Sequence, residues 1–342
     1  MRVLCVFELG SPVEAIHHLK QCAESLRRTK PGIQIYLALK GEAGNADLSW
    51  ADKVLSTPVV KIKSERKDPG FWTHLHQSGW SDPQIRKVTC TIWSNLYRMV
   101  KPDYVIAAGS PSALLVASID GIRGIQVGSG KYIPTISGWD GPCPFPELES
   151  WLFLITRHTA SRLLSHPAIV FNNRSLDEPR EGAVFNVYDD IGVVGSEGVG
   201  KDVIAVWDKR HPLTKRLRDF AAKTWGDRFV EMSAEALRVE GIDGQAIGSS
   251  KPLVVGNYDA LSVNLAIRYD LPYIGSPLTK QQGATAEKCE EARISFRLDD
   301  GLKMLRSYAD QPFALQAHAL ARDDMKVKAY ADLDQALSFL LR

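Results

Sequence analysis

Short apolar runs alternate with longer amphipathic segments along most of the chain, and this alternation restricts the fold more than any other feature. Residues 2–7 read as a buried strand, and apolar side chains then recur at helical spacing from Val13 to Leu26. The same order returns where an apolar run at residues 104–108 is followed by a helical segment and another apolar run. Strands that alternate with helices form parallel sheets with right-handed crossovers. We therefore predict an α/β protein.

The length of the chain predicts two such domains. At 342 residues it is longer than most single domains. Residues 173–201 are polar, rich in glycine and without periodicity, which is typical of a linker, and a second set of apolar runs begins at Val203. We predict domains at residues 1–180 and 181–330, and a last helix within 331–342 that could pack back on the first domain.

Individual elements follow from the same patterns. The expected strands cover residues 2–7, 33–39, 104–108, 125–127, 168–171, 203–207, 229–232, 252–256 and 273–276. The expected helices cover residues 11–26, 81–100, 113–119, 148–155, 213–222, 257–270 and 333–341, and the polar loop that ends at Gln282 opens another. Residues 128–147 are rich in glycine and proline and predict a long functional loop.

Composition excludes several classes of protein. A net charge of +2 and a pI of about 8.2 give no argument for a concentrated basic face, so we expect no nucleic-acid partner. The five cysteines are scattered and include no C-x-x-C pair, which argues against a metal cluster or a disulfide framework. Such cysteine usage fits a reducing compartment, and we expect a cytoplasmic protein.

Nothing in the sequence predicts a membrane span. The start of the chain has no signal-peptide pattern, and the apolar stretch at residues 104–119 is interrupted by Gly109 and Pro111. Peripheral contact stays open, because a basic cluster on the first helix could touch anionic lipid, although a solvated helix face explains it as well. This cluster consists of Lys20, Arg27, Arg28 and Lys30.

Residues 195–202, with the sequence GSEGVGKD, come close to a phosphate-binding P-loop. That mechanism requires a strand before the loop, a helix after it, and Ser or Thr at the last position to bind magnesium. Asp202 stands at that position, and the residues after it predict a strand. A chance match within a linker is therefore favoured over a nucleotide triphosphatase.

Three polar residues on the first helix are candidates for chemistry. His17 and His18 could act as a base, although most histidines in such places are packing or surface residues. Glu14 could also be a base, but its place three residues after Ser11 fits a helix-capping box without any catalytic role.

A basic pair lies at the start of the second half of the chain. Lys209 and Arg210 follow the strand expected at residues 203–207. Ligands of open α/β sheets bind at the carboxyl ends of the strands, so these side chains could contact a diphosphate. An exposed loop end explains them equally well.

Several motifs of the chain, weak one by one, are specific as a set. They lie at residues 79–83, 100–107, 111–115, 127–134 and 272–282. With them the chain resembles, over most of its length, the bacterial GT-B-fold glycosyltransferases related to the UDP-glycosyltransferases. The resemblance implies two Rossmann-like domains that face a cleft. It also implies transfer of a sugar from a nucleotide-sugar donor to an acceptor hydroxyl, with inversion and without a metal or a further cofactor.

For the donor, the resemblance implies contacts in the second domain. The phosphate-contacting positions fall at Asn257, where the family has histidine, and at Ser262, and the sugar-binding pair falls at Gln281 and Gln282. Lys209 and Arg210 join them as candidate diphosphate ligands. Two positions depart from the family: Asp259 replaces a glycine beside the diphosphate, and Leu265 replaces the glutamate that binds ribose.

For the acceptor, the resemblance implies a site in the first domain. The family's early Gly-His pair falls at Glu14 and Ala15, so the usual base is absent. His17, His18 or Glu14, or a group outside this helix, would have to replace it. The acceptor, a small molecule or a lipid, would lie in a pocket formed by Gly10, Gly128, Lys131 and Trp139.

Two other functions fit the sequence. The chain could be a catalytically degenerate member that binds a nucleotide sugar or a protein partner, or it could be a two-lobed binding protein. A carboxylate or histidine beside Gly10 and residues 128–131 would favour the enzyme over both.

Overall fold

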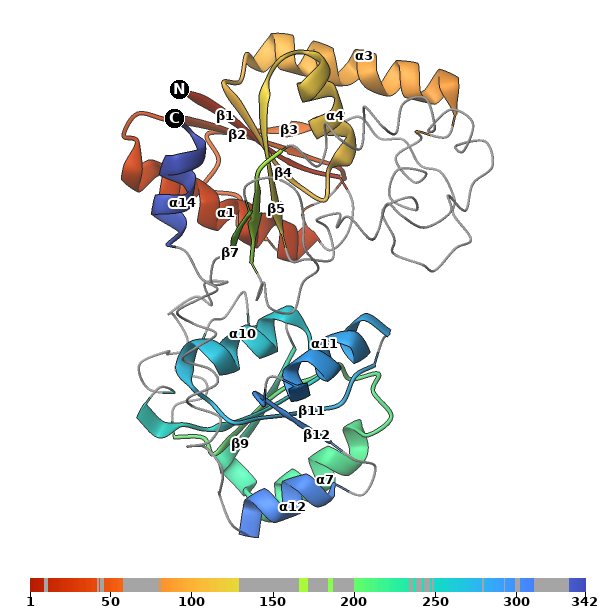
Figure 1. Ribbon diagram of the computed structural model, residues 1–342, viewed down its shortest axis with the longest axis vertical. Helices are drawn as coiled ribbons and strands as arrows, with labels where there is room; N and C mark the ends of the chain where they lie inside the picture. The colour runs from red at the N-terminus through yellow and green to blue at the C-terminus, as the bar shows by residue number, and fades with distance from the viewer. Residues whose placement is uncertain are drawn as a thin grey trace. The chain divides into compact units, whose positions relative to one another are not determined.

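The computed structural model divides into two compact units, which are described one by one (Figure 1). Unit 1 comprises residues 1–171, 177–187 and 331–342, and unit 2 comprises residues 172–176 and 188–330. The residues described are 1–8, 12–41, 43, 46–57, 80, 82–128, 166–171, 184–186, 200–233, 236–237, 242, 247, 249–278, 280–291, 293–298, 302–310 and 332–342.

Unit 1 is built on a parallel sheet of seven strands in the order β3-β2-β1-β4-β5-β6-β7. The strands are β1 (Arg2–Phe7), β2 (Gln34–Leu39), β3 (Lys53–Ser56), β4 (Tyr104–Ala108), β5 (Arg123–Gly128), β6 (Ala168–Val170) and β7 (Val184–Asn186). Phe7 pairs with Leu39 on one side and with Ala108 on the other, so the carboxyl ends of three strands lie side by side.

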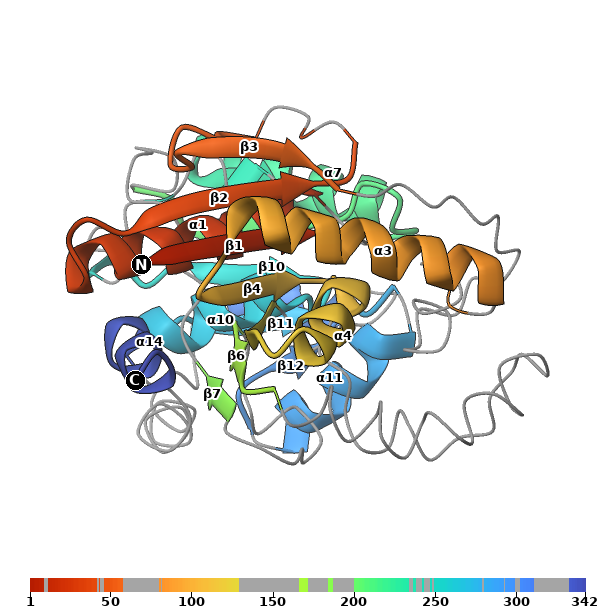
Figure 2. The same ribbon diagram turned by 90° about the horizontal axis from the view of Figure 1, so that it is seen from above.

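Helices cover both faces of this sheet because side chains of a strand alternate between its faces. Val3, Cys5 and Phe7 of β1 belong to a core that includes α1 and α14, whereas Leu4 and Val6 belong to a second core with α3 and α4 (Figures 1 and 2). The helices are α1 (Pro12–Thr29), α3 (Pro83–Val100), α4 (Pro111–Ile119) and α14 (Leu333–Leu340).

The sequence sets the ends of α3. The Asp82 carboxylate accepts hydrogen bonds from the backbone N–H groups of Gln84 (2.7 Å) and Ile85 (3.1 Å), and Pro83 occupies the first turn. Lys101 ends the helix in a left-handed conformation just before Pro102, which cannot continue it.

α14 packs against α1 within unit 1. Leu337 and Leu341 are buried in the same core as α1. At the rim, the Arg28 guanidinium contacts the Asp334 carboxylate at 2.8 and 3.2 Å, and the Lys30 ammonium donates to the Leu341 carbonyl at 2.8 Å.

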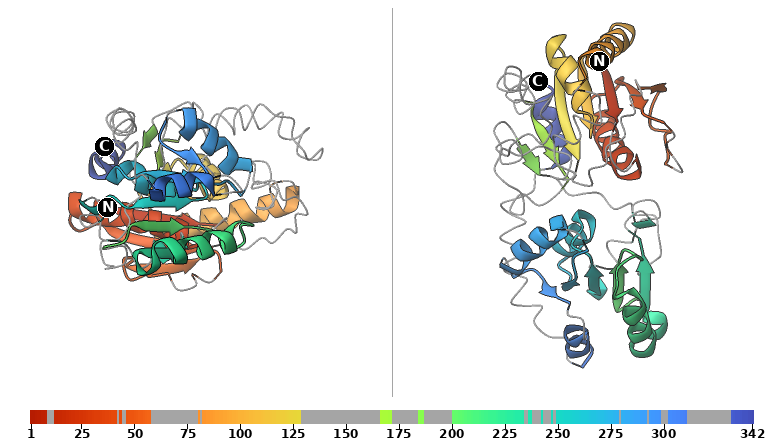
Figure 3. Two further views of the ribbon diagram at one scale, coloured as in Figure 1. Left: turned by 90° about the horizontal axis from the view of Figure 1, so that it is seen from below. Right: turned by 90° about the vertical axis from the view of Figure 1, so that its right-hand side faces the viewer.

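Unit 2 is built on a parallel sheet of five strands in the order β12-β11-β10-β8-β9. The strands are β8 (Val203–Val206), β9 (Phe229–Met232), β10 (Leu253–Gly256), β11 (Tyr273–Gly275) and β12 (Phe296–Arg297). The helices are α7 (Thr214–Thr224), the 3-10 helix η3 (Gly226–Arg228), α10 (Ala260–Tyr269), α11 (Lys280–Glu291) and α12 (Lys303–Asp310). One face of the sheet carries α10 and α11, and the other carries α7 and α12, the green and blue helices at the foot of Figure 3, right.

The α/β fold class with two parallel sheets, predicted from the sequence, is confirmed. Three short strands, β3, β7 and β12, and the helix α12 were not predicted. β7 lies inside the segment interpreted as a linker and extends unit 1 beyond residue 180. The helix expected at residues 148–155 lies outside the described residues. None of the described helices is both long and apolar enough to cross a membrane.

Candidate functional site

The carboxyl edge of the unit 2 sheet has the topology of a ligand site. From β8 the chain moves to β9 on one side and then crosses to β10 on the other side of β8. Open α/β sheets bind ligands outside the carboxyl ends of their strands at such a reversal. Here the reversal brings together the loop that follows β8, residues 207–213, and the loop that follows β10, residues 257–259.

Asn257 joins the ends of three strands at this edge. Its Oδ1 accepts from the backbone N–H of Asp208 at 2.6 Å, and its Nδ2 donates to the Ser276 carbonyl at 2.9 Å. Since a backbone N–H can only donate and a carbonyl can only accept, the two partners fix the orientation of the amide. The side chain is 2% exposed. Asn257 therefore lies where the sequence places a phosphate contact, but its amide also holds the loops after β8 and β11.

Two buried tyrosines support the loop after β10. Tyr258 has a left-handed backbone conformation, with φ of 58°, and its N–H donates to the Tyr273 hydroxyl at 2.8 Å. Glycines in the neighbouring strands leave room for the rings, because a Cβ on Gly275 would lie 2.6 Å from the Tyr258 ring. A Cβ on Gly256 would lie 2.9 Å from the Ser262 hydroxyl and closer still to that of Tyr273.

Asp259 occupies the N-terminus of α10. Its carboxylate accepts from the backbone N–H of Ser262 at 3.0 Å and from the Ser262 hydroxyl at 2.8 Å. That hydroxyl also lies 3.0 Å from the Tyr273 hydroxyl and is fully buried. A helix N-terminus attracts anions, and the resemblance places the donor phosphates at this one. In the structure, a side-chain carboxylate is already bound there.

Lys209 and Arg210 lie in the loop after β8 and are both exposed. Arg210 forms an ion pair with Asp208 at 2.6 Å, and this contact lowers the pKa of the Asp208 carboxyl. Because Asp208 is bonded to Asn257, both cations lie beside the loop that opens α10.

Gln281 and Gln282 lie in the first turn of α11, directly after the end of β11. The Gln282 side-chain oxygen accepts from the Leu278 N–H at 2.8 Å and so fixes the loop that enters the helix. The strand order places this loop on the side of β10 that is opposite to β8.

The unit 1 candidates lie at the corresponding edge of the other sheet. His18 is 1% exposed, and its ring stacks on Phe171 with centroids 4.3 Å apart and planes 3° apart. Glu14 lies in the first turn of α1, and Gly128 ends β5. The other predicted acceptor residues, Gly10, Lys131 and Trp139, lie outside the described residues.

One carboxylate at this edge was missed by the sequence reasoning. Glu8 directly follows β1, is 8% exposed, and its Oε2 accepts from the Ser110 hydroxyl at 2.5 Å. Burial raises its pKa to about 7, against the opposing effects of Ser110, of the cationic Lys40, and of Ser112 and Ala113 as further donors. The signal available in the sequence was a carboxylate directly after the first strand of a parallel sheet.

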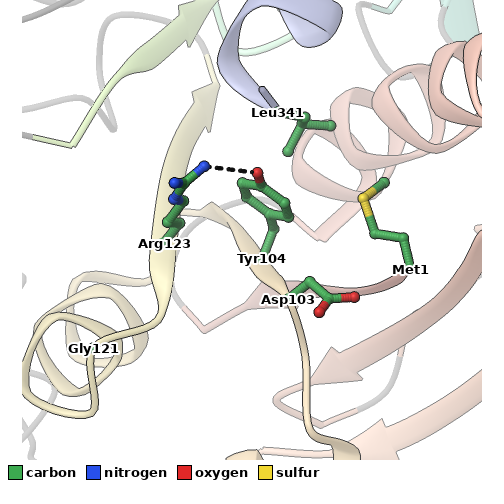
Figure 4. A pocket seen from close by; sticks show the side chains of 6 residues that line it. All are labelled: Met1, Asp103, Tyr104, Gly121, Arg123 and Leu341. Atoms are coloured by element: carbon green, nitrogen blue, oxygen red, sulfur yellow. Dashed lines mark hydrogen bonds between the residues drawn. The ribbon is translucent and has the colours of Figure 1, made fainter.

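A separate cavity of about 490 Å³ lies where the strands of unit 1 begin (Figure 4). Its lining includes Asp103, Tyr104 and Arg123, and the Arg123 guanidinium donates to the Tyr104 hydroxyl at 3.0 Å. This is the amino edge of the sheet, opposite to the edge that carries Glu8. Within the described residues, no three His, Cys, Asp or Glu side chains gather as a metal site.

Solved structures with the same fold are glycosyltransferases. The spinosyn rhamnosyltransferase SpnG, in complex with thymidine diphosphate, matches with a TM-score of 0.64 at 13% identity, over 100% of both chains. The glycosyltransferase VinC, in complex with dTDP, matches with a TM-score of 0.64 at 16% identity, over 100% of this chain and 99% of its own. SnogD from Streptomyces nogalater matches with a TM-score of 0.61 at 14% identity, over 100% and 98%. The chain therefore has the fold of GT-B glycosyltransferases.

No protein-family model matches the sequence, and no curated protein matches it. The likeness to the solved structures, at 13–16% identity, is one of fold.

Proposed function

We propose that this protein is a glycosyltransferase that moves a sugar from a nucleotide-sugar donor to an acceptor hydroxyl. The observation that carries the proposal is the likeness of the chain, over its whole length, to solved glycosyltransferases. Two of these structures contain thymidine diphosphate. A nucleoside diphosphate is the part that such a donor leaves behind, so it is the first ligand to test.

The donor would bind at the carboxyl edge of the unit 2 sheet. Lys209 and Arg210 would approach the diphosphate as cations. Gln281 and Gln282 would donate hydrogen bonds to the sugar hydroxyls and accept hydrogen bonds from them. Asn257 and Ser262 would contribute through the loop and the helix N-terminus that they hold in place.

The carboxylate of Asp259 opposes a diphosphate at this position. Two like charges a few ångströms apart repel each other strongly where water is excluded. Because Arg210 already forms an ion pair with Asp208, binding requires the positive charges of Lys209 and Arg210 to outweigh Asp208 and Asp259 together. We infer that the affinity of this chain for the donor depends more on the loop after β8 than the affinity of the family members does.

For the acceptor, we propose a small molecule or a lipid that binds unit 1 near Gly10, Gly128, Lys131 and Trp139. One neighbour, SpnG, is also solved with spinosyn aglycone. We further propose inversion at the anomeric carbon, no metal and no cofactor other than the co-substrate. We propose a cytoplasmic protein without a nucleic-acid partner, and the four described cysteines, which are free thiols, are consistent with a reducing compartment.

A second candidate is a degenerate GT-B protein that binds a nucleotide sugar or a protein partner without catalysis. One observation favours it: at the site expected for phosphate, Ser262 is bonded to Asp259, and Asn257 is bonded to the backbone of Asp208 and Ser276. Only a ligand that competes with these contacts, or lies beside them, would bind there.

A thermal-shift series with TDP, UDP and GDP and their glucose conjugates, with and without magnesium, tests the proposal. A ligand of the folded state raises the melting temperature by mass action. We expect a shift with one nucleotide that Lys209→Ala weakens and that the matched control Lys223→Ala, an exposed lysine at the end of α7, leaves unchanged. Transfer of radiolabelled sugar to added acceptors then separates the enzyme from the degenerate binder. A folded protein that responds to none of these nucleotides would contradict the donor site itself.

A further inference from the structure

Glu8 lies at the position in unit 1 where the sheet topology predicts a ligand. From β1 the chain continues to β2 and β3 on one side, and then crosses to β4 on the other side of β1. The reversal therefore falls between β1 and β4. Glu8 follows β1 directly, and Ser110 lies between the end of β4 and the start of α4. The Ser110–Glu8 hydrogen bond, at 2.5 Å, joins the two loops of the reversal.

The donors around Glu8 fix its orientation. Ser110 donates its hydroxyl proton to Oε2, and Ser112 and the backbone of Ala113 lower the pKa of the Glu8 carboxyl. The Trp80 indole N–H, which can only donate, gives a 2.8 Å bond to the Ser112 hydroxyl, so the proton of that hydroxyl is available to Glu8. An ionised carboxylate accepts about four hydrogen bonds. Ser110 takes one of these positions, at Oε2, and the incoming hydroxyl would take another.

We propose that Glu8 is the base that takes the proton of the acceptor hydroxyl, an inference that rests on the glycosyltransferase function proposed above. In the step, the acceptor O–H proton passes to a Glu8 oxygen while the acceptor oxygen forms a bond to the anomeric carbon of the donor. The bond from that carbon to the diphosphate oxygen breaks, and the diphosphate leaves with the electron pair. The neutral Glu8 then returns its proton to water.

The ionisation of Glu8 suits this role. A base works best when its pKa lies near the working pH, and burial raises the pKa of Glu8 to about 7. Among the described residues, the charged and titratable groups that act on it are Lys40, which follows β2, and Tyr97 of α3. Lys40 favours the carboxylate form. Tyr97 donates its hydroxyl proton to the Ala113 carbonyl at 2.5 Å, and burial keeps it neutral by raising its pKa far above 10.

The plainer alternative is that Glu8 only stabilises the start of α4. The two roles differ in what they predict for acceptors of different acidity. A base is needed for an acceptor that holds its proton tightly, and hardly at all for one that is already ionised. Loss of a structural contact lowers transfer to both acceptors alike.

The experiment compares wild type, Glu8→Gln and the control Glu24→Gln, an exposed carboxylate of α1, with 4-nitrophenol, phenol and benzyl alcohol as acceptors and the nucleotide glucose that binds. Glutamine keeps an oxygen that accepts from Ser110 and cannot take a proton. We expect Glu8→Gln to lower kcat on benzyl alcohol about 100-fold to 10,000-fold, with a much smaller loss on 4-nitrophenol. The rise of wild-type kcat through about pH 7 should vanish in Glu8→Gln and persist in Glu24→Gln.

The outcomes separate this inference from the function on which it rests. Equal losses on all acceptors with unchanged pH dependence, or no loss in Glu8→Gln, would overturn the role of Glu8 and leave the glycosyltransferase standing. A wild type that transfers sugar to none of the acceptors overturns both. The thermal shift with nucleotide shows that the donor site of unit 2 is intact, and urea unfolding of Glu8→Gln serves as the folding control for unit 1, where Glu8 lies.

Discussion

Replacement of Asn257 by alanine tests whether its amide holds the ligand edge of unit 2 together. The change removes the hydrogen bond from the Asp208 N–H (2.6 Å) and the hydrogen bond to the Ser276 carbonyl (2.9 Å). Asn257 itself is 2% exposed. Each lost hydrogen bond that leaves a partly buried backbone group without its partner costs roughly 1–2 kcal/mol, so we expect a loss of about 2–4 kcal/mol. For a domain of this size that is about 4–16 °C in melting temperature.

Urea unfolding of the full chain, followed by hydrogen exchange at the amides of β10 and β11, measures this loss. Lys209→Ala is the matched control, because Lys209 lies in the loop that Asn257 holds but is exposed. We expect the control to stay within about 0.5 kcal/mol of wild type. If Asn257→Ala also stays within that limit, the amide does not hold the loops, and the assignment of its two bonds is refuted.

Three further substitutions probe other parts of the molecule. Gly256→Ala should lower the stability of unit 2 by about 1–3 kcal/mol in urea unfolding, because its Cβ would meet the Tyr273 hydroxyl; a neutral effect would show that the tyrosine moves freely. Glu8 holds a proton in the folded state that the unfolded chain releases above about pH 4.5, so its contribution to stability is greatest below that pH and is lost as the pH rises through about 7. As the pH rises from about 5 to about 8, Glu8→Gln should therefore gain stability relative to wild type. A difference in stability between the two proteins that stays constant over this range would contradict the raised pKa of Glu8. Leu337→Ala should cost about 2–5 kcal/mol in thermal or urea unfolding, whereas Arg28→Ala on the exposed rim of the same helix pair should cost at most about 1 kcal/mol.

The long elements were predictable because their own residues determine them. β1, β4, β8 and β10 are continuous apolar runs, and α3 carries its cap and its terminating proline in its sequence. The short strands are different. β3 has only exposed or half-buried side chains, and β12 has two residues, so pairing with a neighbouring strand defines them more than their own hydrophobicity.

The candidate site was predictable in position but not in contacts. The sequence places Asn257 at the end of a parallel strand, where ligands bind. It could not reveal that the amide is held by Asp208 and Ser276, which lie 49 and 19 residues away. Glu8 was missed for the same reason, because its partner Ser110 is 102 residues away and only the pairing of β1 with β4 brings them together.

The packing of α14 on α1 has a consequence for how the protein is made. Unit 1 takes its first helix from the start of the chain and its last helix from residues that follow all of unit 2. On the ribosome, the apolar stripe of α1 that Leu337 and Leu341 cover therefore stays open until unit 2 has been synthesised. A chain that stops before residue 332 presents that stripe to solvent permanently. We therefore expect forms truncated before residue 332 to be less soluble than the full chain, because they lack Leu337 and Leu341.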